Sequence, residues 1–236
     1  MRTLDRRKLL GLSGLLCLGG CTGFGLSAAS QPISAYSLDD LAGSTHSAGR
    51  AEALPGPGLL IATAPVALLY DTDRMVFTRD GAAYAYYQFA NWSDRPARRI
   101  SQLAEARLSQ RGRFASVGST TSGLRGERLL SLRLEWLLHD DSRSPGEVRL
   151  AVTGEMIDTR TRTLLGRERF EAQARVRSRD AQGAAQAGSE ALTTLLNALC
   201  DWTENRGGSV AATAARPRPP EPVAIRAPAP PPPDRV

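Results

Sequence analysis

The sequence contains few of the residues from which catalytic and metal-binding sites are built. Its 236 residues include only two histidines and three cysteines. It has neither a glycine-rich phosphate-binding loop nor the G-x-S-x-G motif of nucleophilic hydrolases. Beyond the N-terminus, no stretch approaches the roughly 20 apolar residues of a spanning helix, which excludes a multi-span membrane protein. We therefore expect a protein that is not an enzyme and carries no cofactor or metal ion, with a hydrolase as the weakest alternative.

The excess of basic residues is concentrated at the two ends of the chain. Of the net charge of +6, residues 1–20 carry +3 and residues 207–236 carry +2, which leaves +1 for residues 21–206. A nucleic-acid-binding surface needs a basic patch or stripe on the folded domain. We therefore expect no nucleic acid among the partners, and a chain long enough for one globular domain of ordinary size.

Residues 1–20 have the layout of a secretory signal peptide, a basic segment followed by an apolar run from Leu9 to Leu18. The sequence Leu-Gly-Gly-Cys that ends at Cys21 resembles a bacterial lipobox. Cleavage there leaves Cys21 as the first residue, whose thiol carries fatty-acyl chains such as palmitate. The predicted site is therefore lipidation of Cys21, and a plain signal peptide with an incidental cysteine is the alternative.

The flanks of this segment bear on export and sorting. Arg6 and Arg7 resemble a twin-arginine motif, but an ordinary Sec signal that holds two arginines explains them equally. Thr22 stands where an aspartate would suggest retention in the inner membrane. By resemblance to enterobacterial sorting, we expect the periplasmic face of the outer membrane, with the inner membrane as the alternative.

The cysteine count excludes an intramolecular disulfide in the mature chain. Cys17 leaves with the signal peptide and Cys21 is acylated, so Cys200 is the one remaining thiol. It stands in an apolar stretch with helical periodicity. We expect Cys200 to be buried and chemically inert.

The body of the chain predicts one α+β domain over residues 35–206, preceded by a tether over residues 21–34. Strands are expected at 35–38, 59–62, 74–78, 83–91, from 114 onward, 130–140, 147–158 and 163–176. Two helices are expected. The first begins after an N-cap at Ser93 or Asp94 and ends at Gly112, and the second spans 181–206. The three long strands alternate apolar and polar residues with period two, which is typical of an antiparallel meander. The predicted fold is a mostly antiparallel sheet covered on one face by two helices.

The last 30 residues differ sharply in composition from this domain. Residues 207–236 hold nine of the 15 prolines and end in the run Pro230–Pro233. They offer no apolar pattern to bury, so we expect a disordered or polyproline-like tail. Fully extended, it reaches about 90 Å at roughly 3.1 Å per residue.

Two acidic clusters are candidate sites of chemistry. His139 stands beside Asp140 and Asp141, a set able to bind a metal ion, but a solvated strand end is the favoured interpretation. Asp71 and Asp73 are interpreted as turn-capping residues rather than as an acid–base pair.

The aromatic residues are more informative than the charged ones. Five of the 13 aromatic residues fall within nine positions: Tyr84, Tyr86, Tyr87, Phe89 and Trp92. Along a strand, the first two share one face and the next two share the other. One set enters the core, and the second set is either covered by another segment or placed at a partner surface.

Several segments occur in an order and spacing that is similar to a known family. They are Leu69–Phe77, Tyr86-Tyr87, Asn91–Ala97, Leu103–Leu108 and Gly112–Val117. They combine Arg74 before an apolar strand, a tyrosine-rich strand, Trp92 before a helix that a proline starts, and a Phe-x-x-Val strand. From about residue 36 to 202, the chain resembles the ABC-type transport auxiliary lipoprotein family. The loop at 39–58 and the Pro-rich tail depart from the common pattern.

The resemblance implies a non-catalytic periplasmic lipoprotein, similar to that of the paraquat-inducible lipid transport system. Such lipoproteins are encoded with an ATPase, a permease and a substrate-binding protein that bears the mammalian-cell-entry domain. The implied function is to dock that cell-entry-domain protein at the outer membrane. The transport system moves lipid or hydrophobic solute between the inner and outer membranes. One possible arrangement of the lipoprotein is a homo-oligomeric ring. The candidate interface or core residues are Arg74, Tyr86, Tyr87 and Trp92.

Two other classes of protein remain as alternatives. A stand-alone lipid-binding lipoprotein would use a cavity lined by the apolar faces of the strands. An envelope structural protein would use the Pro-rich tail to approach peptidoglycan.

Overall fold

The computed structural model describes residues 31–42 and 56–207. The expectations for the signal peptide, Cys21, most of the 39–58 loop and the Pro-rich tail fall on residues outside these ranges. Within the described part of the chain, no helix is long and apolar enough to cross a membrane.

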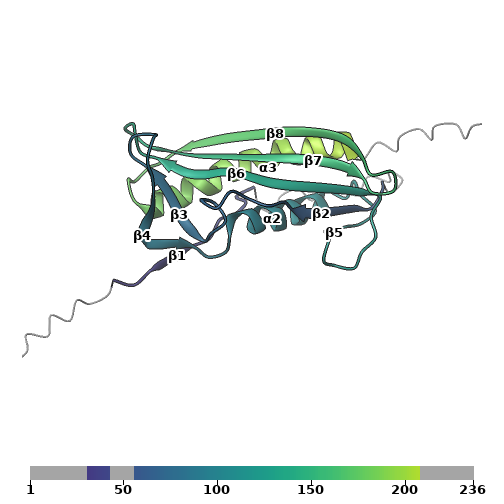
Figure 1. Ribbon diagram of the computed structural model, residues 1–236, viewed down its shortest axis with the longest axis horizontal. Coiled ribbons are helices and arrows are strands. Elements are labelled where there is room, and N and C mark those ends of the chain that lie inside the picture. The colour runs from purple at the N-terminus through teal and green to yellow at the C-terminus, as the bar shows by residue number, and fades with distance from the viewer. Residues whose placement is uncertain (1–30, 43–55, 208–236) are drawn as a thin grey trace, which may run out of the picture. The chain divides into compact units, whose positions relative to one another are not determined.

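The described residues of the domain form eight strands and two helices (Figure 1). Their bounds are β1 Ser34–Tyr36, β2 Leu59–Thr63, β3 Arg74–Thr78, β4 Tyr84–Trp92, α2 Pro96–Arg111, β5 Val117–Ser119, β6 Arg128–Asp140, β7 Glu147–Asp158, β8 Thr163–Arg175 and α3 Ala181–Gly207. These bounds differ from the predicted ones by at most three residues at each end. Every predicted element is therefore present, in the predicted order.

Strand β6 organises the sheet because it pairs along both of its edges. One edge pairs with β7 over the whole length of β6, and β8 continues the sheet beyond β7. The other edge is shared, since residues 128–132 pair with β2 and residues 139–140 pair with β3. The sheet therefore divides beside β6 into one arm of β2 and β5 and another of β3, β4 and β1.

The prediction of a mostly antiparallel sheet is wrong, although the α+β class is confirmed. Four of the seven strand pairings are parallel, namely β1–β4, β2–β5, β2–β6 and β3–β6. The predicted meander of β6, β7 and β8 is antiparallel, as is the β3–β4 hairpin. Period-two alternation reports which face of a strand is buried, but it carries no information on the direction of a distant neighbour.

Both helices cover one face of the sheet and enclose a single core (Figure 1). Alternate side chains of β6, such as Leu130, Leu132 and Leu134, are buried there with the leucines of α3. Cys200 is fully buried among them, as predicted. Burial raises the pKa of its thiol to about 12, which keeps it protonated and unreactive.

The start of α2 differs from the prediction in its capping. The N-cap residue is Arg95, and no side chain caps the helix there. Asp94 instead accepts a hydrogen bond from the Arg95 backbone N–H at 2.8 Å and pairs with Arg98 at 3.2 Å. Pro96 fits this start because its missing N–H is not needed in the first turn. Gly112 ends the helix in the left-handed conformation, with φ of 65°, as its position predicted.

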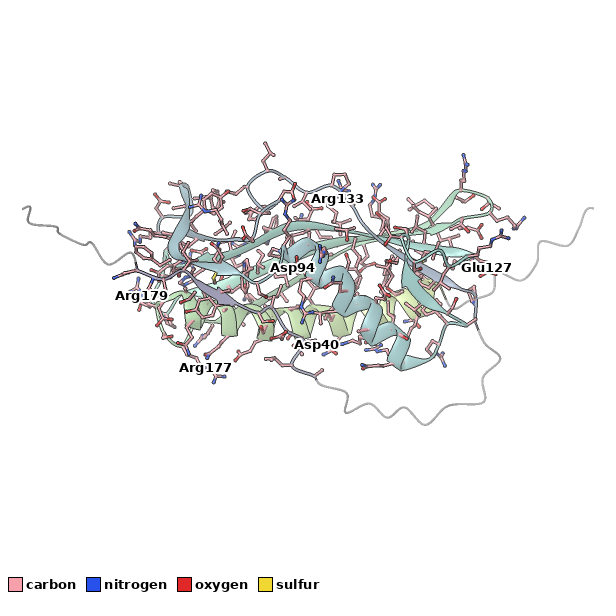
Figure 2. The ribbon with its side chains drawn as sticks, turned by 90° about the horizontal axis from the view of Figure 1, so that it is seen from below. Asp40, Asp94, Glu127, Arg133, Arg177 and Arg179 are labelled. Atoms are coloured by element: carbon pink, nitrogen blue, oxygen red, sulfur yellow. The ribbon has the colours of Figure 1, made fainter. Side chains whose placement is uncertain are left out.

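The segment after β1 is held against both helices by a buried ion pair. Arg107 of α2 donates hydrogen bonds to both carboxylate oxygens of Asp40 and to the side-chain amide oxygen of Asn197 in α3. The side chains of Arg107 and Asp40 are only 9% and 15% exposed. Figure 2 shows Asp40 between the two helices. This cluster therefore joins three parts of the chain that lie far apart in sequence.

Candidate functional site

Strand β4 is irregular at its centre. Against β3, its register moves from Val76–Tyr86 to Arg74–Asn91, so β4 holds three more residues than its partner over this stretch. On its other edge, the pairing with β1 begins only at Ala90. In the strand registers of the described residues, Tyr87, Gln88 and Phe89 therefore have no partner strand.

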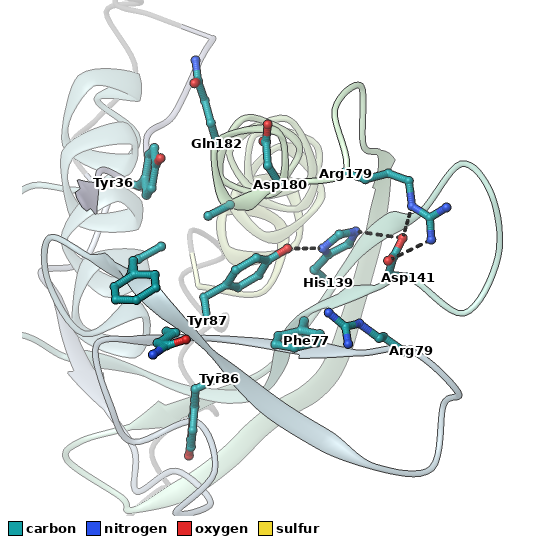
Figure 3. A pocket seen from close by; sticks show the side chains of 14 residues that line it. Tyr36, Phe77, Arg79, Tyr86, Tyr87, His139, Asp141, Arg179, Asp180 and Gln182 are labelled. Atoms are coloured by element: carbon teal, nitrogen blue, oxygen red, sulfur yellow. Dashed lines mark hydrogen bonds and ion pairs between the residues drawn. The ribbon is translucent and has the colours of Figure 1, made fainter. Parts of the chain in front are cut away.

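The two faces of β4 form two different surfaces. Tyr87 and Phe89 line a pocket of about 580 Å³ between β4, the end of β6 and the start of α3. The ring of Tyr86 points away from Tyr87, to the opposite side of the strand (Figure 3). Tyr86 also contributes to the lining of the pocket, but its ring contacts belong to the opposite face.

The opposite face of β4, with β3 and the turn before it, carries exposed and half-buried side chains, which we call the outer patch: Leu68, Tyr70, Arg74, Tyr84 and Tyr86. The Arg74 guanidinium lies 4.1 Å from the centre of the Tyr86 ring, and the Tyr86 hydroxyl donates a hydrogen bond to the Leu69 carbonyl at 3.2 Å. Leu68 is 90% exposed and Tyr84 is 48% exposed. Exposed apolar side chains that gather in one place are typical of interaction sites.

The pocket is aromatic on one wall and polar on the other. Besides Tyr86 and His139, four aromatic residues line it: Tyr36, Phe77, Tyr87 and Phe89. The Phe77 and Tyr87 rings lie 4.9 Å apart. Polar side chains come from the centre of β4, the ends of β3 and β6, the loop before α3 and its first turn: Gln88, Arg79, Asp141, Arg179, Asp180 and Gln182.

A hydrogen-bonded network closes the inner end of the pocket (Figure 3). The Tyr87 hydroxyl lies 2.6 Å from Nδ1 of His139, and Arg179 donates two hydrogen bonds to Asp141, each at 2.9 Å. His139 is only 3% exposed, so the expectation of a solvated strand end is wrong. The loop before α3 and strand β4 cover this end of β6.

The network shifts the pKa values of its members in predictable directions. Burial raises the pKa of Tyr87 to about 12, with the charges of Asp141 and Asp180 adding to it. The hydrogen bonds from Arg179 hold the pKa of Asp141 below its ordinary value, and the backbone N–H of Gly183 does the same for Asp180. Near neutral pH, Tyr87 is therefore protonated and both carboxyls are charged.

We expect His139 to make the stability of the domain depend on pH between about 7 and 5. Burial lowers the pKa of His139 below its ordinary 6.5, so the unfolded chain binds more protons in this window than the folded one. The free energy of unfolding therefore falls as the pH drops. The variant His139→Gln keeps an acceptor for Tyr87 but does not titrate, and it should lose less stability. Urea denaturation at pH 7 and pH 5 measures the free energy of unfolding of wild type and of the variant. An equal fall in the two proteins would contradict the assignment of this pH dependence to His139.

The pocket has an acid–base pair but no nucleophile beside it. Among the described residues, no Ser, Thr or Cys lines it, and no group of three or more His, Cys, Asp or Glu is placed to hold a metal ion. Arg79 is exposed, and its guanidinium lies 5.2 Å from the centre of the Phe77 ring. Aromatic walls with hydrogen-bond donors at the rim are suited to binding an extended or apolar group.

The structure separates the four residues predicted as interface or core. Trp92 lies in the core, 6% exposed, against Leu38 and Gly188. Tyr87 lines the pocket, while Arg74 and the ring of Tyr86 form part of the outer patch. Sequence analysis did not identify the pocket residues Phe77, Arg79, Arg179 and Gln182 as site residues. Phe77 and Arg79 lie at the end of β3, whereas Arg179 and Gln182 lie about 100 positions later at the start of α3, and no motif links the two pairs.

Comparisons with known proteins agree on a family and a fold. The family model for the ABC-type transport auxiliary lipoprotein component matches residues 36–199. A crystal structure of a Xanthomonas campestris protein of family DUF330 superposes with a TM-score of 0.64 at 17% identity, covering 74% of this chain and 97% of that one. The crystal structure of an uncharacterized protein gives a TM-score of 0.56 at 11% identity, covering 72% and 98%. No curated protein sequence matches the chain.

Proposed function

Because this chain belongs to the family of ABC-type transport auxiliary lipoproteins, we propose that it is a non-catalytic accessory of a transporter that moves lipid or hydrophobic solute between the inner and outer membranes. The observation that carries the proposal is the family match, which spans nearly the whole described domain, from β1 into α3. The absence of a nucleophile beside the Tyr87–His139 pair supports a binding role over a catalytic one.

Membrane attachment is proposed to come from acylation of Cys21, after removal of residues 1–20. About 13 residues then separate the anchor from the start of β1, and at 3.3–3.6 Å per residue they span at most about 45 Å. A tether of this length would keep the domain close to the membrane. The residue after the lipobox, Thr22, favours the periplasmic face of the outer membrane.

The outer patch is proposed as the docking surface for the cell-entry-domain component. Leu68 and Tyr84 expose apolar area without a covering segment in the described residues, and the Arg74 guanidinium stacked on Tyr86 adds a cation. Aromatic residues and arginine are the side chains that most often dominate binding energy at protein interfaces. Docking would bury this patch and remove the cost of exposing it to water.

A detergent pull-down of the lipidated protein tests the proposal, with co-purifying proteins and lipids identified by mass spectrometry. We expect a cell-entry-domain protein with its permease and ATPase. Leu68→Asp combined with Tyr84→Asp should reduce their recovery about ten-fold or more, since burying an unpaired charge opposes docking. Leu124→Asp is the matched control. Leu124 is as exposed as Tyr84, at 48%, but it follows β5 on the other arm of the sheet.

The outcomes separate the alternatives. Lipid recovered without a protein partner would contradict docking and favour an independent lipid carrier. Recovery of peptidoglycan that depends on residues 207–236 would favour an envelope structural protein. Equal loss of partners in the patch variant and the Leu124→Asp control would contradict the choice of surface.

A further inference from the structure

The pocket on the inner face of β4 has the chemistry that binds a polyproline helix. Its aromatic wall of Tyr36, Phe77, Tyr87 and Phe89 offers flat apolar faces to proline rings. The carbonyl groups of a polyproline helix have no internal hydrogen bonds and are free to accept from side chains at a rim. Such donors are present here on Arg79, Gln88 and Gln182. Aromatic-lined grooves of this composition are a recurring way to recognise proline-rich segments.

The chain carries a segment of matching chemistry in Pro230–Pro233. Four consecutive prolines form slightly more than one turn of polyproline helix, about 12 Å long at 3.1 Å per residue. Proline restricts its own backbone, so little conformational entropy is lost when such a segment docks.

The length of chain after α3 allows this segment to reach the pocket of the same molecule. Helix α3 has 27 residues, which corresponds to about 40 Å from Ala181 at the pocket to Gly207. Pro230 follows Gly207 by 23 residues, and these span about 70 Å as a polyproline helix. The length of chain is therefore sufficient for Pro230 to reach the pocket, and the entropic cost of closing such a loop grows only slowly with its length.

The residues before β1 are poorly suited to extend β1 along the open edge of β4 at residues 87–89. The Tyr36 carbonyl accepts a hydrogen bond from the Ser93 N–H at 2.8 Å, so Tyr36, Ser34 and Pro32 direct their backbone groups toward β4 if the strand is extended. Pro32 has no N–H to donate. The ladder therefore ends at Ser34, which leaves residues 87–89 of β4 open.

We propose that Pro230–Pro233 docks in this pocket of its own chain, against the aromatic wall between β4 and the start of α3. The inference goes beyond the proposed function, which uses the opposite face of β4. In this arrangement the tail runs back along the domain and shields the irregular centre of β4 from other strands.

Protection of a cysteine at the rim tests the proposal. In the full chain with Cys17 and Cys21 replaced by serine, Gln88→Cys introduces an exposed thiol beside the aromatic wall, while Cys200 stays buried and unreactive. We expect a polar maleimide to label residue 88 about ten-fold or more slowly than in the same chain with Pro230–Pro233 replaced by four serines. Equal rates in the two chains would overturn the proposal.

Two controls make the result specific. Leu124→Cys, on the other arm of the sheet, should be labelled equally fast with either tail. The protection at residue 88 should not change with protein concentration, and protection that disappears on dilution would show that the tail of a second copy fills the pocket, which overturns the same-chain arrangement. Failure here leaves the pull-down result unaffected, because the residues changed there, Leu68 and Tyr84, do not line this pocket.

Discussion

Replacing Cys21 with serine is expected to move the protein from the membrane fraction to the soluble periplasm. In the proposed acylation, the thiol sulfur of Cys21 would carry the first acyl chain, and serine offers no equivalent site for lipoprotein processing. Each buried methylene contributes about 0.8 kcal/mol, so a single chain binds a membrane only marginally, whereas several chains anchor it durably. Cell fractionation after a high-salt wash, followed by immunoblotting, measures the distribution.

Cys17→Ser provides the matched control, because Cys17 lies in the same apolar segment but is removed with the signal peptide. That variant should remain with the membranes as wild type does. Retention of Cys21→Ser in the washed membrane pellet would contradict acylation at this residue.

Replacing Arg107 with methionine is expected to cause the largest loss of stability from a single substitution in the domain. Methionine retains the apolar stem but leaves the Asp40 carboxylate, 15% exposed, without its cation. It also removes the donor to Asn197, 2.5 Å away in α3. Breaking a buried ion pair from one side costs about 3–5 kcal/mol, a large part of the roughly 5–15 kcal/mol that stabilises a domain. The midpoint of urea denaturation should fall accordingly.

Arg98→Met is the control. Arg98 also lies in α2 and pairs with an aspartate, Asp94, but the Arg98 side chain is 68% exposed. Exposed pairs of this kind contribute about 0–1 kcal/mol. The double variant Arg107→Met with Asp40→Leu should recover part of the loss, since it leaves no buried charge unpaired. An Arg107→Met protein within about 1 kcal/mol of wild type would show that the cluster does not hold the segment after β1.

The elements of this fold were predictable from sequence because their signals are local. Alternation along β6, β7 and β8 reports a half-buried strand, and Pro96 and Gly112 mark the ends of α2. The pairing of β2 with β6 was not predictable in this way. It joins residues almost 70 positions apart, and nothing within either strand records that the two run parallel.

The candidate site was predictable only in part, for the same reason. The two faces of β4 follow from its alternating aromatic residues, which placed Tyr87 and Phe89 together. The burial of His139 does not, because the groups that cover it come from Tyr87 and from the loop around Arg179, each at least 40 positions away. Its neighbours Asp140 and Asp141 gave a local signal for a solvated turn, which the tertiary contacts override.

The central claim is that this lipoprotein acts in the same transport step as an ABC transporter. The most direct test compares the lipid composition of separated inner and outer membranes in cells that lack the lipoprotein, the co-purifying ATPase, or both. The account predicts that each single deletion shifts the same lipid species between the membranes, and that the double deletion shifts them no further. Changes in different species, or a double deletion whose shift is the sum of the two single ones, would contradict it.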